Sequence, residues 1–259
     1  MTAGAIMGGA DEKLDPFDEG GMHLVPVPMS ESDVALYYEG FSNATHWPLY
    51  HDVIVAPEFH RTWWDRYREV NRRFAEAAAG AASEGATVWV QDYQLQLVPA
   101  ILRRLRPDVR VGFFNHIPFP PLEIFAQLPW RRRVLEGLLG ADLIGFQRQS
   151  DANNFLRCVR RYLGYTVKAQ HVHVADDGGA PHRLVRAEAH PISIDAARIA
   201  ELARDPEIQA RAREIREDLG NPETILLGVD RLDYTKGIRH RIKAFGELLE
   251  DGELHVGQA

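Results

Sequence analysis

The sequence predicts an α/β protein built on a parallel β-sheet, followed by the start of a second α/β lobe. Short apolar segments alternate with helix-forming segments between residues 87 and 163, and one more such pair follows residue 224. This alternation is typical of parallel sheets with helices on both faces. Apolar residues make up 45% of the 259 residues and charged residues 26%, so the chain can bury a globular core.

Composition also excludes several classes of protein. The formal net charge is −7, whereas nucleic-acid binders normally carry a basic excess, so we expect no nucleic-acid partner. No apolar run reaches about 18 residues, so no membrane span is predicted. Cys158 is the single cysteine and cannot form an internal disulfide. The amino terminus lacks the apolar core of a signal peptide, and we expect a cytoplasmic protein.

The amino-terminal third is predicted to lead from an irregular arm into a long helix. Ser30 and Asp33 have the spacing of a capping box, which opens a helix. In chain order we expect a loose arm over 1–21, a strand over 22–27, a short helix to about residue 39, an aromatic ordered loop over 41–52 and an amphipathic helix over 58–82.

The alternating pattern then fills the middle of the chain. The predicted strands lie at 87–90, 109–114 and 143–146, and the predicted helices at 95–105, 121–139 and 151–163. Two further strands, 167–174 and 182–190, flank Asp176–Gly179, whose Asp-Asp-Gly-Gly sequence favours a hairpin turn. Together these segments predict a Rossmann-like lobe with a parallel sheet and its covering helices, and we expect this lobe to be incomplete.

A second lobe is predicted to begin near the carboxyl end. Polar helical segments follow Asp195 and are broken at Pro206, and a buried strand over 225–229 leads into a helix over 237–250. One strand and one helix do not complete an α/β lobe, so we expect this lobe to be cut short. The predicted domains are a loose arm at 1–21, a Rossmann-like lobe at 22–195, and linker helices with the start of a second lobe at 196–259.

Polar side chains follow each predicted parallel strand at its carboxyl end. They are Gln91 and Asp92, Asn115 and His116, Gln147, and Asp230 and Arg231. Ligands of open α/β sheets bind outside this edge, so an acid, an imidazole, amides and an arginine would meet in one crevice. Such a set suits a polyhydroxylated, anionic ligand. The alternative is that each residue only caps its strand or the next helix.

The segment 231–237 carries the pattern of an anion site. Lys236 and Gly237 stand at the start of a predicted helix, with Thr235 as the expected N-cap. A helix amino terminus together with Lys236 and Arg231 attracts anions. The alternative is that Arg231 pairs with Asp233 and that Lys236 is merely solvated.

Aromatic and histidine residues offer weaker signals. Tyr38 and Trp47 bracket a polar loop and could hold a sugar by stacking and hydrogen bonding, although composition alone slightly favours ordinary packing. His171 and His173 have the spacing of a metal pair, but no third ligand follows, so we expect them only to share a strand face and predict no metal site. Trp64 and Cys158 are expected in the core, as is Trp63.

Four motifs occur in an order and spacing that resemble a known family. They are Tyr38–Pro48 (YEGFSNATHWP), Trp89–Tyr93 (WVQDY), Gly112–Pro120 (GFFNHIPFP) and Val229–Gly237 (VDRLDYTKG). The chain resembles the trehalose-6-phosphate synthases, retaining glycosyltransferases of GT-B fold, over about residues 22–252. The resemblance implies transfer of glucose from UDP-glucose or ADP-glucose to glucose 6-phosphate, giving α,α-trehalose 6-phosphate, with no metal or other cofactor.

The resemblance also implies roles for matching residues on the acceptor side. Tyr38 and Asp92 would hold glucose 6-phosphate. Trp47 would form a wall of the acceptor site and, with Ile117, select the anomer of the product.

On the donor side, His116 would hydrogen-bond the glucose, and Arg231 and Lys236 would bind the diphosphate and stabilise its leaving charge. Asp92, His116, Arg231 and Lys236 would then form the catalytic set. The acceptor hydroxyl would attack on the leaving-group face, and the departing phosphate would take its proton.

Two departures from the family pattern bear on activity. Gly8-Gly9 and Gly20-Gly21 lack the context of the family's donor-contacting glycine loop, and the chain stops before the later donor-binding segments. We therefore expect the middle of the enzyme without either end, and no measurable synthase activity from this chain alone. The alternative function is an inactive family member that binds sugar phosphate or regulates an intact synthase. Assembly into a homo-oligomer is compatible with the sequence, as is either donor nucleotide.

Overall fold

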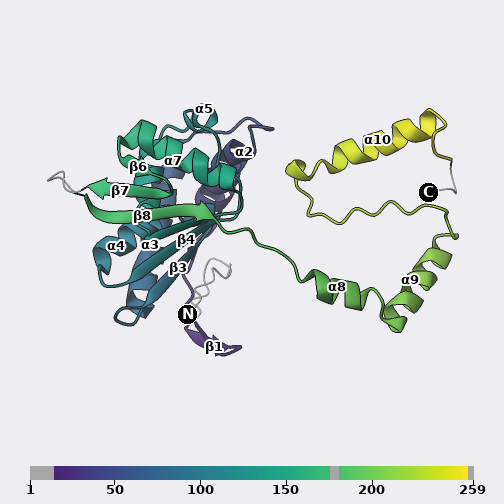
Figure 1. The fold of residues 1–259 in the computed structure, drawn as a ribbon, viewed down its shortest axis with the longest axis horizontal. Helices are drawn as coiled ribbons and strands as arrows, with labels where there is room; N and C mark the ends of the chain where they lie inside the picture. Colours follow the sequence, from purple (N-terminus) through teal and green to yellow (C-terminus); the bar gives the residue numbers. More distant parts are fainter. Residues whose placement is uncertain (1–14, 176–180, 256–259) are drawn as a thin grey trace. The chain divides into compact units, whose positions relative to one another are not determined.

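The computed structural model describes residues 15–175 and 181–255 of the chain. It divides into two compact units, Met1–Ile192 and Ser193–Ala259, which we call the amino-terminal and carboxyl-terminal units (Figure 1). Residues 1–14 of the predicted loose arm lie outside the described residues, as does the predicted hairpin turn over 176–179.

A six-stranded mixed sheet forms the centre of the amino-terminal unit. Its strands are β3 (Thr87–Gln91), β4 (Arg110–Asn115), β5 (Leu143–Phe146), β6 (Thr166–Lys168), β7 (His171–Ala175) and β8 (Pro181–Ala189). The order is β3-β4-β5-β8-β7-β6, in which β3, β4, β5 and β8 run parallel and β7 and β6 are antiparallel additions. The predicted α/β fold with a parallel sheet is confirmed.

The segment predicted as a single strand over 167–174 forms two strands. β6 ends at Lys168, and Ala169 takes a positive φ of 50°, so the chain reverses before β7. β7 then pairs antiparallel with β8, as the hairpin prediction requires.

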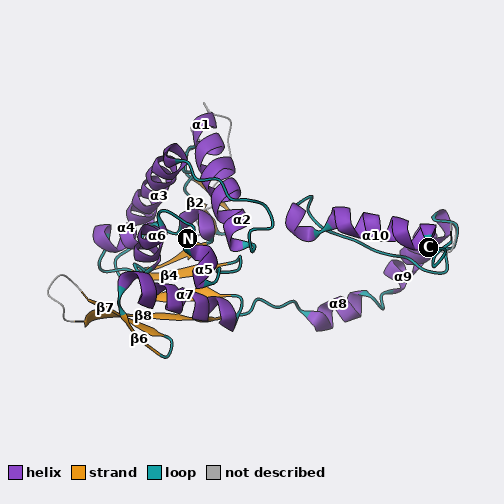
Figure 2. Cartoon of the chain, turned by 90° about the horizontal axis from the view of Figure 1, so that it is seen from above, coloured by secondary structure: helices purple, strands orange, loops and turns teal. Residues whose placement is uncertain are grey.

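The helices of the amino-terminal unit cover one face of the sheet, where we had predicted both (Figure 2). The crossover helices are α4 (Val98–Leu105), α6 (Arg131–Leu138) and α7 (Gln149–Leu163), with the single-turn α5 (Leu122–Phe125) before α6. Successive parallel strands step in one direction across the sheet, so right-handed crossovers place each helix on the same side. On the other side, Trp89 is 67% exposed and Leu184 is 54% exposed.

Most of the region predicted as a loop over 41–52 is helical, since helix runs to Tyr50 and only the last two residues form a turn. After α1 (Glu31–Asp33), a π-helix, η1, runs over Val34–His46 and leads directly into α2 (Trp47–Tyr50). The prediction failed because the segment lacks the 3.6-residue period of an α-helix, whereas a π-turn is wider. Burial stabilises it: Phe41 lies against the rings of Trp64 and Tyr67 on the long helix α3 (Arg61–Ala81), at centroid distances of 5.3 and 4.4 Å.

The predicted arm also contains structure. β1 (Phe17–Glu19) pairs antiparallel with β2 (Met22–Leu24), which is shorter than the strand predicted over 22–27. Two adjacent glycines at positive φ, Gly20 and Gly21, make the turn between them.

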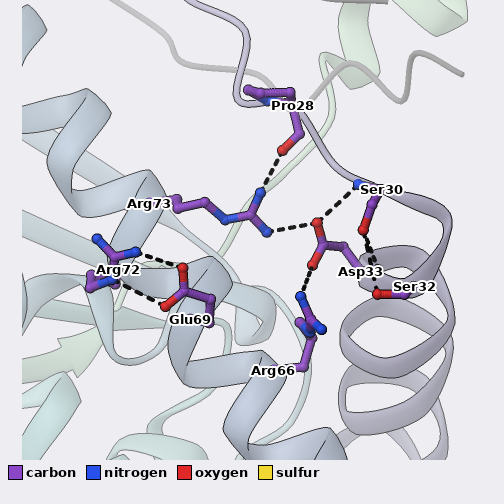
Figure 3. A network of polar contacts seen from close by, with 8 residues as sticks. All are labelled: Pro28, Ser30, Ser32, Asp33, Arg66, Glu69, Arg72 and Arg73. Carbon is purple, nitrogen blue, oxygen red and sulfur yellow. Dashed lines mark hydrogen bonds and ion pairs between the residues drawn. The ribbon is translucent and has the colours of Figure 1, made fainter. Parts of the chain in front are cut away.

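A buried carboxylate fastens the helix start to α3 (Figure 3). The Ser30–Asp33 capping box is confirmed, with each side chain accepting from the other residue's backbone amide. Asp33 also forms ion pairs with Arg66 at 3.0 Å and Arg73 at 2.8 Å. Arg73 donates in addition to the carbonyl of Pro28 at 2.7 Å. This network ties the segment that leads into η1 to the long helix.

The core of the amino-terminal unit includes the residues expected there. Trp64 and Cys158 are buried, and Trp63 packs against the core from the outside. Glycine allows the helices to approach closely: a Cβ on Gly137 of α6 would lie 2.5 Å from the carbonyl oxygen of Gln96.

The carboxyl-terminal unit consists of helices and extended segments. The elements are α8 (Ala196–Leu202), α9 (Pro206–Asp218), a 3₁₀ turn η3 (Tyr234–Lys236) and α10 (Ile238–Glu250). The break at Pro206 is confirmed, since this proline stands at the start of α9, capped by Asp205. Across the described part of the whole chain, no helix is long and apolar enough to cross a membrane.

The strand predicted over 225–229 is not formed in the structure. A strand needs a neighbour for its backbone groups, and no other strand occurs among the described residues of this unit. Its apolar side chains are exposed instead, with Leu227 84% accessible.

Candidate active site

Asp92 stands at the carboxyl end of β3 in an unusual backbone conformation. Its φ is 67° and its ψ is 174°, outside the regions that non-glycine residues normally occupy. Such a conformation costs on the order of 1–3 kcal/mol and persists only where its surroundings hold it. Backbone hydrogen bonds on both sides do so here, from the Asp92 amide to Phe114 at 2.8 Å and from the Leu95 amide to Asp92 at 3.1 Å.

The Asp92 carboxylate is half-buried and pre-oriented by backbone amides. Its Oδ1 accepts from the amide of Tyr93 at 2.9 Å and from the amide of His116 at 3.0 Å. Burial raises the pKa of Asp92, and the hydrogen bonds from His116 and Tyr93 only partly oppose that rise. A carboxylate has about four acceptor positions, so the group keeps capacity for hydroxyl donors of a ligand.

His116 lies beside Asp92 at the same sheet edge, where β4 has just ended. Its Nε2 is 2.6 Å from Oε1 of Gln91, a pairing in which the imidazole N–H donates to the amide oxygen. The ring of Phe114 lies 4.7 Å away between centroids. The His116 side chain is exposed, so it is accessible to a ligand.

Buried amides fix the segment that carries His116 and Ile117. Asn115 donates from Nδ2 to the carbonyl of Ile117 at 2.6 Å, and its Oδ1 accepts from Nε2 of Gln96 at 3.2 Å. Ile117 itself is buried. Asn115 therefore lies in the interior and supports the backbone of this segment. The sequence instead predicts it among the polar side chains that meet a ligand at the sheet edge.

Trp47, at the start of α2, packs against the residue that follows Asp92. Its ring lies 5.7 Å from the ring of Tyr93, the residue that follows Asp92, and 4.2 Å from that of His51. The Tyr93 hydroxyl donates to Oδ1 of Asn43 on η1 at 2.9 Å. The structure thus brings Asp92 and His116 together, with Ile117 next in the chain, and it packs Trp47 on Tyr93, the residue after Asp92. Tyr38 also lies on η1, half-buried against the core.

Several residues of this region were not found by sequence reasoning. Tyr93 and Asn43 join η1 to the edge of β3, and Tyr67 and Asn71 of α3 support the turn after Asp92. Asn71 offered one signal, because it is a polar residue on the apolar face of a helix, between Val70 and Phe74. A buried amide there needs partners, and the turn supplies them.

Gln147, the remaining predicted residue of this edge, follows β5. Its Oε1 accepts from the backbone amide of Ile192 at 3.0 Å, so here it anchors the chain at the end of the amino-terminal unit.

Arg231 and Lys236 belong to the carboxyl-terminal unit, and both side chains are exposed. Lys236 ends η3 directly before α10, as predicted. The predicted N-cap Thr235 is wrong: Asp233 caps η3 by accepting from the amide and the hydroxyl of Thr235. Gly237 precedes α10 at φ 63°, a conformation that glycine adopts without strain.

The histidine pair occupies the strand face predicted for it. His171 and His173 are alternate residues of β7, opposite Arg186 and Leu184 of β8. Over residues 15–175 and 181–255, no group of three or more His, Cys, Asp or Glu side chains is arranged to hold a metal ion.

Comparison with known proteins places the chain in a family. Residues 8–259 match the family model described as glycosyltransferase family 20. The chain belongs to this family. Within family 20, it is 60% identical over 247 residues to a trehalose-6-phosphate synthase of Mycobacterium sp. (strain JLS), covering 94% of this chain and 51% of the relative. A trehalose-6-phosphate synthase of Mycolicibacterium gilvum is equally similar, with 49% of that protein covered. The resemblance drawn from the four motifs is confirmed.

Solved structures of the family share the fold. The trehalose-6-phosphate enzyme from E. coli bound with UDP-2-fluoro glucose superposes with a TM-score of 0.81 at 33% identity, covering 95% of this chain and 53% of that one. The synthase from Burkholderia xenovorans in complex with glucose-6-phosphate gives a TM-score of 0.82 at 31% identity, with 95% and 54% covered. The chain therefore spans about half the length of the relatives it matches.

Proposed function

We propose that this chain carries the acceptor site of a retaining glucosyltransferase that joins glucose to glucose 6-phosphate and forms α,α-trehalose 6-phosphate. The observation that carries the proposal is the Asp92 carboxylate, held beside His116 by two backbone amides, with Trp47 packed on the ring of the adjacent residue Tyr93. The Burkholderia relative is described in complex with glucose-6-phosphate, which supports the choice of acceptor.

The acceptor sugar would be held by hydrogen bonds and by an aromatic wall. Asp92 would accept hydrogen bonds from two of its hydroxyls, and Tyr38 would contribute its phenol. Trp47, with the buried Ile117 behind the site, would limit the orientation of the sugar ring and so select the anomer. Aromatic rings with polar tips suit this task because one side of a sugar is apolar.

The donor would be a nucleoside diphosphate glucose, UDP-glucose or ADP-glucose. His116 would hydrogen-bond the glucose, while Arg231 and Lys236, before α10, would bind the diphosphate. The acceptor hydroxyl oxygen would form a bond to the anomeric carbon on the face from which the phosphate leaves. The bond to the phosphate breaks with its electron pair, and the departing phosphate takes the hydroxyl proton. Positive charge at that phosphate stabilises the developing negative charge.

In this proposal the two regions of the chain bind different substrates. The lobe over 22–195 would bind the acceptor, and the segment over 196–259 would begin the nucleotide-sugar lobe. The E. coli relative, described as bound with UDP-2-fluoro glucose, supports a nucleotide-sugar donor for the family.

The test is titration of the purified chain with glucose 6-phosphate by calorimetry. We expect saturable binding by the wild-type chain and a loss of roughly 10–150-fold in affinity for Asp92→Asn, because a hydrogen bond to a charged group contributes about 1.5–3 kcal/mol. Asp142→Asn is the matched control, since Asp142 pairs with Arg103 away from this edge. Absence of binding by the wild-type chain, or equal binding by Asp92→Asn, would contradict the proposal.

A further inference from the structure

Two side chains of α3 hold the backbone of the turn that follows Asp92. Tyr67 and Asn71 stand one helical turn apart, and both are fully buried. The Tyr67 hydroxyl donates to the carbonyl of Tyr93 at 2.7 Å and accepts from the amide of Gln96 at 3.1 Å. One phenol oxygen therefore bridges the two ends of the 3₁₀ turn η2 (Tyr93–Leu95).

Asn71 performs the same task with its amide. Its Nδ2 donates to the carbonyl of Gln94 at 2.9 Å, and its Oδ1 accepts from the amide of Leu97 at 3.0 Å. Nδ2 also donates to the carbonyl of Tyr67 at 2.9 Å, which fixes the orientation of the amide. Four backbone groups of the turn over 93–97 are thus satisfied by two side chains of a different element.

The same turn sets the position of the Asp92 carboxylate. The Leu95 amide donates to the Asp92 carbonyl, and the Tyr93 amide donates to Oδ1 of Asp92. Because Asp92 has a strained backbone with φ 67°, small shifts of the turn would let it relax to an ordinary conformation. Its carboxylate would then leave the place where the His116 amide meets it.

We propose that Tyr67 and Asn71 are positioning residues for Asp92, which keep its carboxylate in the geometry that binds the acceptor sugar. The expected effect on acceptor binding rests on the proposed function, whereas the expected effect on the position of the Asp92 carboxylate does not. A purely structural role would stabilise the core without fixing Asp92. The two roles predict different behaviour of the Tyr93 and His116 amides, which donate to the Asp92 carboxylate.

Two variants remove these contacts, each with a control that removes the same chemistry elsewhere. Tyr67→Phe deletes the bridging hydroxyl and keeps the ring, and Tyr162→Phe deletes a hydroxyl that donates to the Leu122 carbonyl at 3.3 Å. Asn71→Ala deletes the bridging amide, and Asn154→Ala deletes an amide that donates to the Phe119 carbonyl at 3.0 Å. Tyr67→Phe keeps the test decisive even where Asn71→Ala does not fold.

Backbone amide resonances of Tyr93 and His116 report the position of the carboxylate without any ligand. We expect both to shift in Tyr67→Phe and Asn71→Ala, together with faster amide exchange at Gln96 and Leu97. Neither control variant should move them. Titration with glucose 6-phosphate should show about a tenfold loss of affinity in the two test variants, the size expected for one hydrogen bond's contribution.

Two results would overturn the proposal. Resonances of Tyr93 and His116 that move no more than in the controls would show that Asp92 does not depend on α3. Shifted resonances with unchanged glucose 6-phosphate affinity would show that the supported geometry does not serve binding. Failure of the wild-type chain to bind glucose 6-phosphate would instead reject the proposed function, and the resonances would still decide whether α3 positions Asp92.

Discussion

At the scale of single residues, the candidate site depends on polar atoms that are held before any ligand arrives. Asp92 receives two amide hydrogen bonds, and His116 pairs with Gln91. Groups fixed in this way lose little further freedom on binding, which favours both affinity and correct orientation. The residue types at this edge follow from the sequence, but their fixed geometry comes from partners elsewhere in the chain.

Lys236 provides a test of the donor side. In an assembled synthase that contains this chain, Lys236→Ala should lower kcat and weaken use of the nucleotide sugar, because its ammonium would face the diphosphate where charge grows. Lys243→Ala is the matched control, since Lys243 is exposed on α10 and pairs with Glu247. Steady-state kinetics with each substrate varied decides the question. A change confined to the KM for glucose 6-phosphate would place Lys236 on the acceptor side.

His46 should make the stability of the chain depend on pH. It is fully buried, with its ring 4.5 Å from Phe41 and 5.4 Å from Tyr67, and burial lowers the pKa of His46 to about 3. An unfolded histidine has a pKa of about 6.5. Between these values the unfolded chain binds a proton that the folded chain does not, so stability falls as pH falls.

The expected size is about 1.4 kcal/mol for each pH unit within that window. Urea denaturation at pH 7 and pH 5 measures it, with His46→Gln as the variant that cannot titrate. We expect the loss of stability on acidification to be about 2 kcal/mol smaller in His46→Gln. Equal losses in both proteins would show that folding does not lower the pKa of His46.

At the scale of elements, the placement of η1 against α3 decides where Tyr38 and Trp47 lie. Ring contacts of Phe41 with Trp64 and Tyr67 form part of this interface. The ion pairs of Asp33, the last residue before η1, fasten the start of this segment to the same helix (Figure 3). Burial raises the pKa of Asp33, but the Ser30 amide and Arg73 outweigh it, so the pKa lies below its ordinary value.

Asp33→Asn should therefore destabilise the chain at neutral pH by about 3 kcal/mol, the lower end of the cost of breaking a buried ion pair. Because the pKa is lowered on folding, this contribution is complete above the ordinary aspartate pKa of about 4 and is lost as pH falls through the folded value. Denaturant titrations at pH 7 and pH 3 measure both. Asp65→Asn, which removes exposed pairs with Arg61 and Arg68, should cost less than about 1 kcal/mol. Equal effects of the two substitutions would contradict the role given to Asp33.

The elements also show where sequence patterns succeed. The strand predicted over 143–146 has the same bounds as β5, and the helix predicted over 151–163 differs from α7 only at its start. These segments have a clear period or a continuous apolar run between turn residues. The segment 41–52 has neither, since its helical form depends on aromatic partners on α3, far away in the sequence.

At the scale of the whole molecule, the two units differ sharply in burial. The apolar core described in the structure belongs to the amino-terminal unit. Among residues 193–255, Pro222 is the one buried residue, and Leu232 is 95% exposed. Regions with few buried apolar contacts open most easily.

Limited proteolysis should therefore cleave the chain first within 193–255. A protease specific for arginine has many sites in both units, and we expect cuts near Arg204, Arg211 and Arg213 before any cut in α3 or α7. Mass spectrometry of the early fragments identifies them. Early cleavage at Arg72 or Arg157, at a rate similar to the carboxyl-terminal sites, would contradict this order.

The sequence by itself determined the three parallel strands β3, β4 and β5 to within about a residue, the order of the four motifs and the family, because these depend on local periodicity and on residue identity. It also placed Asp92 and His116 at one sheet edge, since the carboxyl ends of parallel strands must meet there. Only the tertiary structure decided that η1 is helical, that the helices cover one face, and that Tyr67 and Asn71 hold the turn after Asp92. It also showed Ile225–Val229 without a strand partner, an outcome that its apolar composition did not reveal. The physical reason is common to all four: each depends on a partner distant in the sequence, which no local pattern specifies.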